Sequence, residues 1–180
     1  MRKLGHGFTI VELLVTITIL VILTTLVIVR LQSTEAGARD NEREIDITTI
    51  ANGLEVYYQD GSPDRSIPKG YYPGRTQVQS ALSSPSPFNE FLEGVSKTSF
   101  EAPGRTITTS FNSHATTGTN PDGSYTDAQA RTLLSSYPYL YHPVQRNNAY
   151  CASYENCVKF YLYYLEEDTD TVIVLRSKNQ

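Results

Sequence analysis

The stretch FTIVELLVTITILVILTTLVIV, residues 8–29, decides the fold of the N-terminal part of this chain. It contains one charged side chain, Glu12, and neither glycine nor proline. At 1.5 Å per residue, a helix of 22 residues measures about 33 Å, which matches the hydrocarbon core of a bilayer. The sequence therefore predicts a membrane-spanning helix over residues 8–29.

The segments on either side of this helix set its direction. Arg2 and Lys3 precede it, so the positive-inside rule places the N-terminus in the cytoplasm and the residues after Arg30 outside. The 180-residue chain is of a size that one hydrophobic core serves, so we expect a single head domain after the helix. The formal charge of -4 provides no overall attraction for nucleic acid or for anionic lipid.

An apolar N-terminal segment is also typical of a secretory signal and of a simple membrane anchor. A secretory signal has an apolar region of roughly 7 to 15 residues before its cleavage site. The run here is longer, and Arg30 and Glu35 separate it from the small residues 36–38 that imitate such a site. An uncleaved single-pass anchor explains the length and the flanking charges, with Glu12 reaching toward the interface. It gives no reason for an acidic residue at this position.

A cut between Gly7 and Phe8 supplies such a reason. The new α-amine of Phe8 has a pKa of about 8 and is mostly protonated near neutral pH. It is four residues from Glu12, so it can pair with that carboxylate within one helix or with the carboxylate of a neighbouring chain. A buried charge that loses its partner costs about 3 to 5 kcal/mol. The pair Phe8–Glu12 would therefore fix the register in which helices associate.

The residues around this cut resemble a known family. Gly7, Phe8 and the following TIVELL, behind a short basic leader, are similar to the class III signal of type IV pilins and pseudopilins. The resemblance implies cleavage after Gly7 by a prepilin peptidase and N-methylation of Phe8. It implies assembly with identical or related pilin subunits by the pilus machinery, with the chain in the cytoplasmic membrane before assembly and in an extracellular filament afterwards.

The following residues predict a second, amphipathic half of the helix. Ile47, Ile50, Leu54 and Tyr57 recur at offsets of three and four, which places them on one face. We expect one long helix over residues 8–59, about 78 Å in length.

One feature departs from the pattern of the family. Many type IV pilins carry a proline near the outer end of the membrane segment, whereas this chain has Val29 there and no proline before Pro63. Any local melting of the helix on assembly is therefore expected near Gly37.

The remaining residues, 60–180, predict a globular head of the α+β class. Residues 158–165 and 171–176 are rich in β-forming side chains and flank a polar turn, so we expect an antiparallel hairpin. Residues 139–142 add a third strand, and residues 106–111 a possible fourth. Residues 127–134 predict a short helix capped by Thr126, and residues 88–95 one or two helical turns. The division is a leader over residues 1–7, a helix over residues 8–59 and a small antiparallel sheet packed on its outer half.

The two cysteines, Cys151 and Cys157, lie outside the membrane in this topology, so we expect a disulfide. It would close a short loop and stabilise the head by roughly 2 to 3 kcal/mol. Near the C-terminus such a loop resembles the disulfide-bounded region that pilins expose.

Enzymatic and metal-binding functions find little support in the sequence. It contains no GxSxG, HExxH or GxxxxGK motif, and His6, His114 and His142 lack neighbours at metal-ligand spacing. We therefore expect no enzyme and no cofactor. Calcium stays open because carboxylates alternate in three places, although each lacks a full ligand set. These candidates are Asp60, Ser62 and Asp64; Asp122 and Asp127; and Asp168 and Asp170.

Tyrosines alternate with other residues in the predicted strands. They are Tyr137, Tyr139, Tyr141, Tyr161, Tyr163 and Tyr164. Packing of one sheet face is the favoured interpretation, with exposed rings for adhesion as the alternative. The sequence names no ligand for the head, so a host surface and DNA both stay open. The predicted function is a structural subunit of a type IV pilus or pilin-like filament. The alternatives are a pseudopilin of a secretion or DNA-uptake system and an anchored binding protein that never polymerises.

Overall fold

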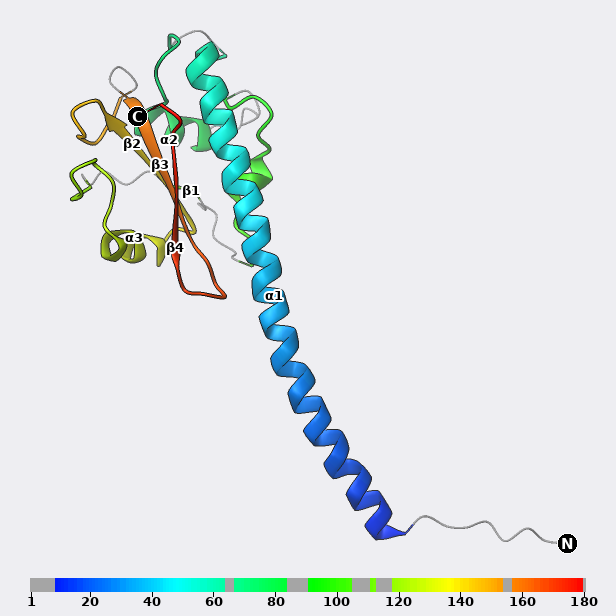
Figure 1. Ribbon diagram of the computed structural model, residues 1–180. Helices are drawn as coiled ribbons and strands as arrows, with labels where there is room; N and C mark the ends of the chain where they lie inside the picture. The colour runs from blue at the N-terminus through cyan, green and yellow to red at the C-terminus, as the bar shows by residue number, and fades with distance from the viewer. Residues whose placement is uncertain are drawn as a thin grey trace, which may run out of the picture. The chain divides into compact units, whose positions relative to one another are not determined.

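The computed structural model describes residues 9–63, 67–83, 91–104, 111–112, 118–153 and 157–179. It confirms the α+β class, with a long N-terminal helix α1 (Ile10–Asp60) and an antiparallel hairpin near the C-terminus (Figure 1). The chain divides into two compact units, Met1–Ala38 and Arg39–Gln180. We call them the stem and the head. Since α1 crosses the boundary, its outer part from Arg39 onward belongs to the compact head.

Within the stem, the segment Ile10–Ile28 of α1 is apolar, and its large side chains are exposed. Ile10–Ile28 is long and apolar enough to cross a membrane, and it is the one such helix in the described part of the chain. Its threonines do not weaken this property, because their hydroxyls donate to carbonyls three or four residues earlier at 2.7–2.8 Å. The helix also continues through Gly37. Whether melting on assembly centres there stays a prediction.

The outer part of α1 supplies one wall of the head core. The predicted stripe is confirmed, because Ile47, Ile50, Leu54 and Tyr57 are at most 3% exposed. Gly53 lies on the packed side, and a Cβ there would come within 2.4 Å of Cγ2 of Val95. This glycine lets the turn before Val95 approach the helix closely.

The head contains a four-stranded sheet in the order β1-β2-β3-β4. The strands are β1 (Phe111–Asn112), β2 (Tyr139–Gln145), β3 (Cys157–Leu165) and β4 (Val172–Arg176). β1 is parallel to β2, and the other neighbours are antiparallel. The predicted hairpin and third strand are confirmed. Of the predicted strand at 106–111 only Phe111 lies within the described residues.

Alternation along β3 directs its side chains to two different partners. Phe160, Leu162 and Tyr164 join the core formed with α1. Tyr161 and Tyr163 point to the other face, where they pack with Leu134 of α3 (Asp127–Leu134). The sheet therefore separates two hydrophobic clusters. The helix α3 begins as predicted, with Thr126 and Gln129 forming a capping box.

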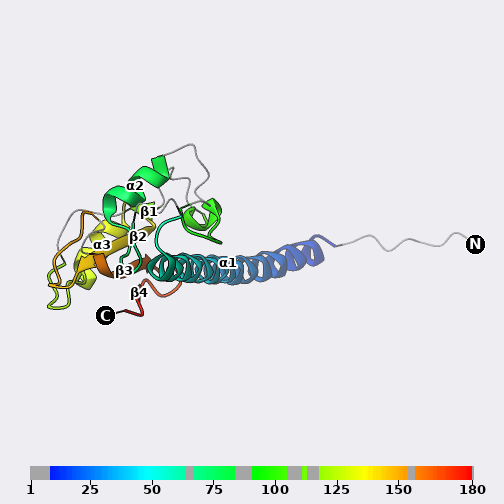
Figure 2. The same ribbon diagram turned by 90° about the horizontal axis from the view of Figure 1, so that it is seen from above.

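Two short elements were not predicted from the sequence. They are α2 (Arg75–Ser83) and the 3-10 helix η2 (Lys97–Phe100), and Figure 2 shows α2 across the head from α1. The first turn of α2 packs on the loop between the cysteines, since Thr76 N–H donates to Ala152 O at 3.2 Å. A Cβ on Gly74 would lie 2.7 Å from the same oxygen, so glycine is required. The predicted turn at 88–95 lies partly outside the described residues, and a turn occupies residues 91–94.

The strand tyrosines are mostly buried, as the packing interpretation expects. Five of the six are at most 3% exposed: Tyr139, Tyr141, Tyr161, Tyr163 and Tyr164. The hydroxyls of four of them, Tyr164 excepted, bond to backbone or carboxylate atoms, for example Tyr141 to Pro73 O at 2.7 Å. Tyrosine here combines an apolar ring that packs in the core with a hydroxyl that bonds to polar groups of the surrounding loops.

His142 is fully buried on the α3 side of the sheet. Its Nε2–H donates to Gly123 O at 2.9 Å, and its ring centroid lies 4.1 Å from that of Tyr125. Nδ1 has no hydrogen-bond partner among the described atoms. Burial lowers the pKa of His142 to about 4 from an ordinary value of 6.5, because a charged imidazole would be poorly solvated here.

This burial predicts a loss of stability in mild acid. The unfolded chain binds a proton at His142 below about pH 6.5, whereas the folded chain does so only near pH 4. Lowering the pH through this window is therefore expected to reduce the free energy of unfolding by about 3 kcal/mol. Near-ultraviolet circular dichroism of the detergent-solubilised chain, followed during denaturation at several pH values, measures the effect. His142→Gln keeps a donor and removes the titration, so its stability should vary less between pH 6.5 and 4.5; equal slopes would contradict the assignment.

Candidate functional site

The stem is the first candidate for a functional surface, because it exposes an unusual amount of apolar area. Fourteen large side chains between Ile10 and Ile28 are 47–85% exposed in the isolated chain. Burying a side chain of this kind contributes about 1.5–3 kcal/mol, so covering the stem is worth on the order of tens of kcal/mol. Only lipid or other apolar helices can cover such a surface.

Glu12 is the only charged residue in this surface. It lies in the first turn of α1, where its N–H donates to Thr9 Oγ1 at 3.2 Å. Leaving this carboxylate unpaired among apolar helices costs several kcal/mol, which is far less than the gain from covering the stem. Glu12 therefore affects how stems associate more than whether they leave water. Gly7 and Phe8 lie outside the described residues, so the pair Phe8–Glu12 stays a prediction.

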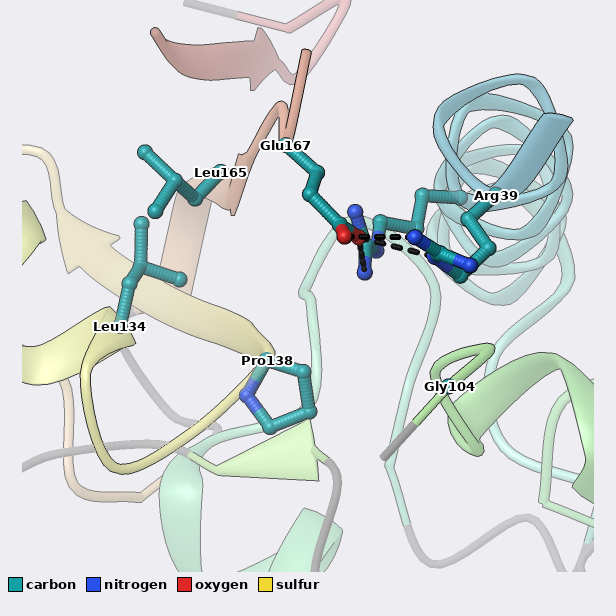
Figure 3. A pocket seen from close by; sticks show the side chains of 7 residues that line it. Arg39, Gly104, Leu134, Pro138, Leu165 and Glu167 are labelled. Atoms are coloured by element: carbon teal, nitrogen blue, oxygen red, sulfur yellow. Dashed lines mark hydrogen bonds and ion pairs between the residues drawn. The ribbon is translucent and has the colours of Figure 1, made fainter. Parts of the chain in front are cut away.

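The head carries a second candidate, a charged cleft beside α1 (Figure 3). Its volume is about 530 Å³. It is lined by Arg39, Arg43, Gly104, Leu134, Pro138, Leu165 and Glu167. One side is therefore apolar, and the other consists of two guanidinium groups and a carboxylate.

The carboxylate of Glu167 bridges both guanidinium groups. Arg39 donates to it through Nε at 2.9 Å and Nη2 at 2.6 Å, and Arg43 through Nη2 at 3.1 Å. These bonds, with that of Arg39 the strongest cause, lower the pKa of Glu167 to about 2. The cations of the cleft are thus neutralised from within the chain.

Asp40 holds the turn that carries Glu167. Its carboxylate accepts from the N–H groups of Glu167 and Asp168 at 2.8–2.9 Å and from Nη1 of Arg43 at 2.6 Å. We call Arg39, Asp40, Arg43 and Glu167 the clamp. The clamp fixes the β3–β4 turn to α1 at the residue where the head begins. Its contacts therefore hold this turn in place on the helix.

The two described residues of the first candidate calcium loop, Asp60 and Ser62, do not form a metal site. Ser62 is buried and accepts the N–H of Ile67 at 2.8 Å. Asp60 is exposed, 3.9 Å from Nζ of Lys69. Asp64 lies outside the described residues.

The other candidate carboxylates bond to cations and turns. Asp122 accepts from Ser124 N–H and Oγ–H, and it pairs with Arg176 at 3.3 Å. Asp127 and Asp170 both pair with Arg131, at 2.7 and 3.0 Å, and Asp168 is exposed. Within the described ranges, the structure brings no three His, Cys, Asp or Glu side chains together as a metal site.

The remaining predicted residues have structural surroundings. Cys151 and Cys157 form the predicted disulfide, and both are buried. The loop is anchored by Tyr72, whose N–H donates to Cys157 O at 2.7 Å. His6 and His114 lie outside the described residues.

Sequence reasoning missed the clamp. Arg39, Asp40 and Arg43 are close along the helix, which is a visible signal of a charged cluster. Their partner Glu167 is 128 residues from Arg39 in sequence, and no spacing rule connects them. Only the path of the hairpin brings the two together.

Comparison with known proteins identifies the N-terminal segment. Residues 2–28 match the family model described as the prokaryotic N-terminal methylation motif. This motif is the class III signal of type IV pilins and pseudopilins. It supports a type IV pilin-like or pseudopilin protein, a structural rather than catalytic class, and the apolar helix fits membrane anchoring. No curated protein and no solved structure matched the chain.

The clamp predicts a specific loss of head stability. Asp40→Ala removes the acceptor of two backbone N–H groups and one partner of Arg43, whose side chain is only 8% exposed. We expect the free energy of unfolding to fall by about 2 kcal/mol. Asp168→Ala, in the same turn but with an exposed side chain, should change it by less than about 0.5 kcal/mol. Denaturant unfolding of both variants tests this, and equal losses would refute the role of Asp40.

Proposed function

We propose that this chain is the structural subunit of a type IV pilus or pilin-like filament. It would be inserted in the membrane and then polymerised through its N-terminal helix, for adhesion and motility. The observation that carries the proposal is that the methylation motif over residues 2–28 coincides with a helix segment whose large apolar side chains between Ile10 and Ile28 are exposed. A folded α+β head follows that stem directly.

The proposed sequence of events begins with removal of residues 1–7. Cleavage after Gly7 frees the amine of Phe8, and methylation leaves its positive charge in place. The apolar segment up to residue 29 remains in the cytoplasmic membrane until the assembly machinery extracts it. In the filament, other stems replace lipid around it. The globular region that the sequence predicts over residues 60–180 faces the exterior.

The charge pair supplies the specificity that apolar contact lacks. Lipid tails and neighbouring apolar helices cover the stem about equally well, so hydrophobic burial alone does not favour association. A buried Glu12 carboxylate changes this balance, because a neighbouring Phe8 amine neutralises it only when two stems are in register. A single-pass anchor that stays in lipid has no use for such a residue.

Mass spectrometry of the mature chain tests the processing step. We expect the chain to begin at Phe8 and to carry one methyl group on its amine. Gly7→Val, which places a branched side chain before the cut, should leave Met1 in place. A wild-type chain that functions with its leader attached would exclude the pairing mechanism, since no amine would then stand beside Glu12.

Substitution of Glu12 tests the assembly step. Glu12→Ala should leave the membrane-bound amount of the chain unchanged, because the apolar area is intact, and should reduce sheared surface filaments at least about tenfold. Glu35→Ala is the matched control, since it removes an exposed carboxylate beyond the apolar segment. Filaments of normal yield from Glu12→Ala would contradict the pairing. Absence of long filaments from the wild type would instead favour the pseudopilin alternative.

A further inference from the structure

At the two ends of the sheet in the head, the charged side chains that form no ion pair within the described residues differ in sign. At one end β2 begins, β3 ends and β4 begins, and the β3–β4 turn closes it (Figure 1). The arginines of this end, in the clamp and in α3, already pair with carboxylates. Five further carboxylates there make no ion pair within the described residues. They are Glu42, Glu44, Glu101, Glu166 and Asp168, which we call the acidic end.

Shared electrostatic neighbours and positions along the chain place these residues near one another. Glu42 acts electrostatically on Tyr139 at the start of β2, and Glu44 and Glu166 both act on Tyr164. Glu101 precedes Pro103, whose carbonyl accepts from Arg43 of the clamp. Ile45, an apolar side chain that is 67% exposed, follows Glu44 on α1. The acidic end thus includes apolar area as well as charge, as docking surfaces usually do.

The opposite end is basic. Arg146 follows β2 directly, and Lys159 lies across from Val144, with its Nζ donating to Asn148 Oδ1 at 2.8 Å. Lys178 follows β4 and is exposed, as is Arg146. We call Arg146, Lys159 and Lys178 the basic end.

Few described anions neutralise the basic end. Asp122 pairs with Arg176 at 3.3 Å, and Asp60 lies 3.9 Å from Lys69. Glu55 is only 5% exposed and accepts the backbone N–H of Lys178 at 2.8 Å. The exposed cations of this end are therefore available to a partner.

The two ends do not neutralise each other within one head. Strand β3 runs from Cys157 to Leu165, which corresponds to about 26 Å at 3.3 Å per residue. The screening length at physiological ionic strength is about 8 Å. Each end therefore presents its own sign of charge to solvent.

We propose that the acidic end docks against the basic end of the head of a second copy of this chain. The inference rests on the proposed function, since it requires that chains polymerise. A contact between two different faces of the same molecule leaves one face free at each terminus, so it repeats along a filament when the rotation between copies does not close a ring. A nucleic acid would use only the basic end and would leave the complementary face unexplained. Individual exposed ion pairs are weak, so this contact sets register and salt sensitivity while the stems provide cohesion.

Charge reversal in the full-length chain tests the docking. Arg146→Glu with Lys178→Glu, and separately Glu42→Lys with Glu44→Lys, should each lower the yield of sheared filaments at least about fivefold and shift the salt dependence of that yield. The four substitutions together restore opposite signs between the exchanged residues, so their yield should exceed that of either double variant and approach that of the wild type. Arg146→Gln with Lys178→Gln examines the same contact with a smaller perturbation of folding, which the thermal midpoint of each variant monitors.

The outcomes separate this proposal from the function on which it rests. Wild-type chains that form no filaments would overturn the proposed function. The docking alone would be overturned if neither charge reversal changed the filament yield. It would also be overturned if the variant with all four substitutions gave no more filaments than the two double variants. A third outcome would identify nucleic acid, rather than a second copy, as the partner of the basic end. In that case the filament yield would depend only on the basic end, and the wild type would bind a short DNA duplex. Arg146→Glu with Lys178→Glu would abolish this binding.

Discussion

The apolar surface of the stem is the constraint on which the other features depend. Fourteen exposed large side chains cannot remain in water, so the chain must reside in lipid or among other apolar helices. Because these two environments are nearly equivalent for apolar side chains, a polar interaction is needed to favour association of helices over lipid. Glu12 is the one ionisable residue in this surface, and the motif over residues 2–28 implies the amine that would complete the pair.

In the head, protein covers one side of the outer part of the same helix. The stripe from Ile47 to Tyr57 is buried by a sheet whose other face carries α3. Tyrosines supply much of this packing, and their hydroxyls hold the surrounding loops. The head therefore has two clusters on either side of one sheet. Its loops are fixed by hydrogen bonds that would be costly to leave unmade in the interior.

Charged side chains have two separate uses in the head. In the clamp they are paired within the chain, where Glu167 neutralises Arg39 and Arg43 and Asp40 satisfies the turn. At the two ends of the sheet, the side chains outside such pairs are exposed or half-buried and of opposite sign. The first arrangement stabilises the monomer, while the second is suited to a partner with the complementary pattern. A repeating contact of that kind and a polymerising stem would act in the same assembly.

Local patterns in the sequence were sufficient for the elements that depend on near neighbours. The unbroken run at residues 8–29, the stripe at Ile47 to Tyr57, the capping box at Thr126 and the hairpin strands all follow from periodicity and capping, which act within a few residues. The position of Cys151 and Cys157 outside the membrane in the expected topology likewise predicted their disulfide. The tertiary structure alone decided the clamp, the helix α2 against the cysteine loop, the burial of His142 and the separation of charge between the ends. Each of these joins residues that are distant in sequence, and only the folded path of the chain determines which of them meet.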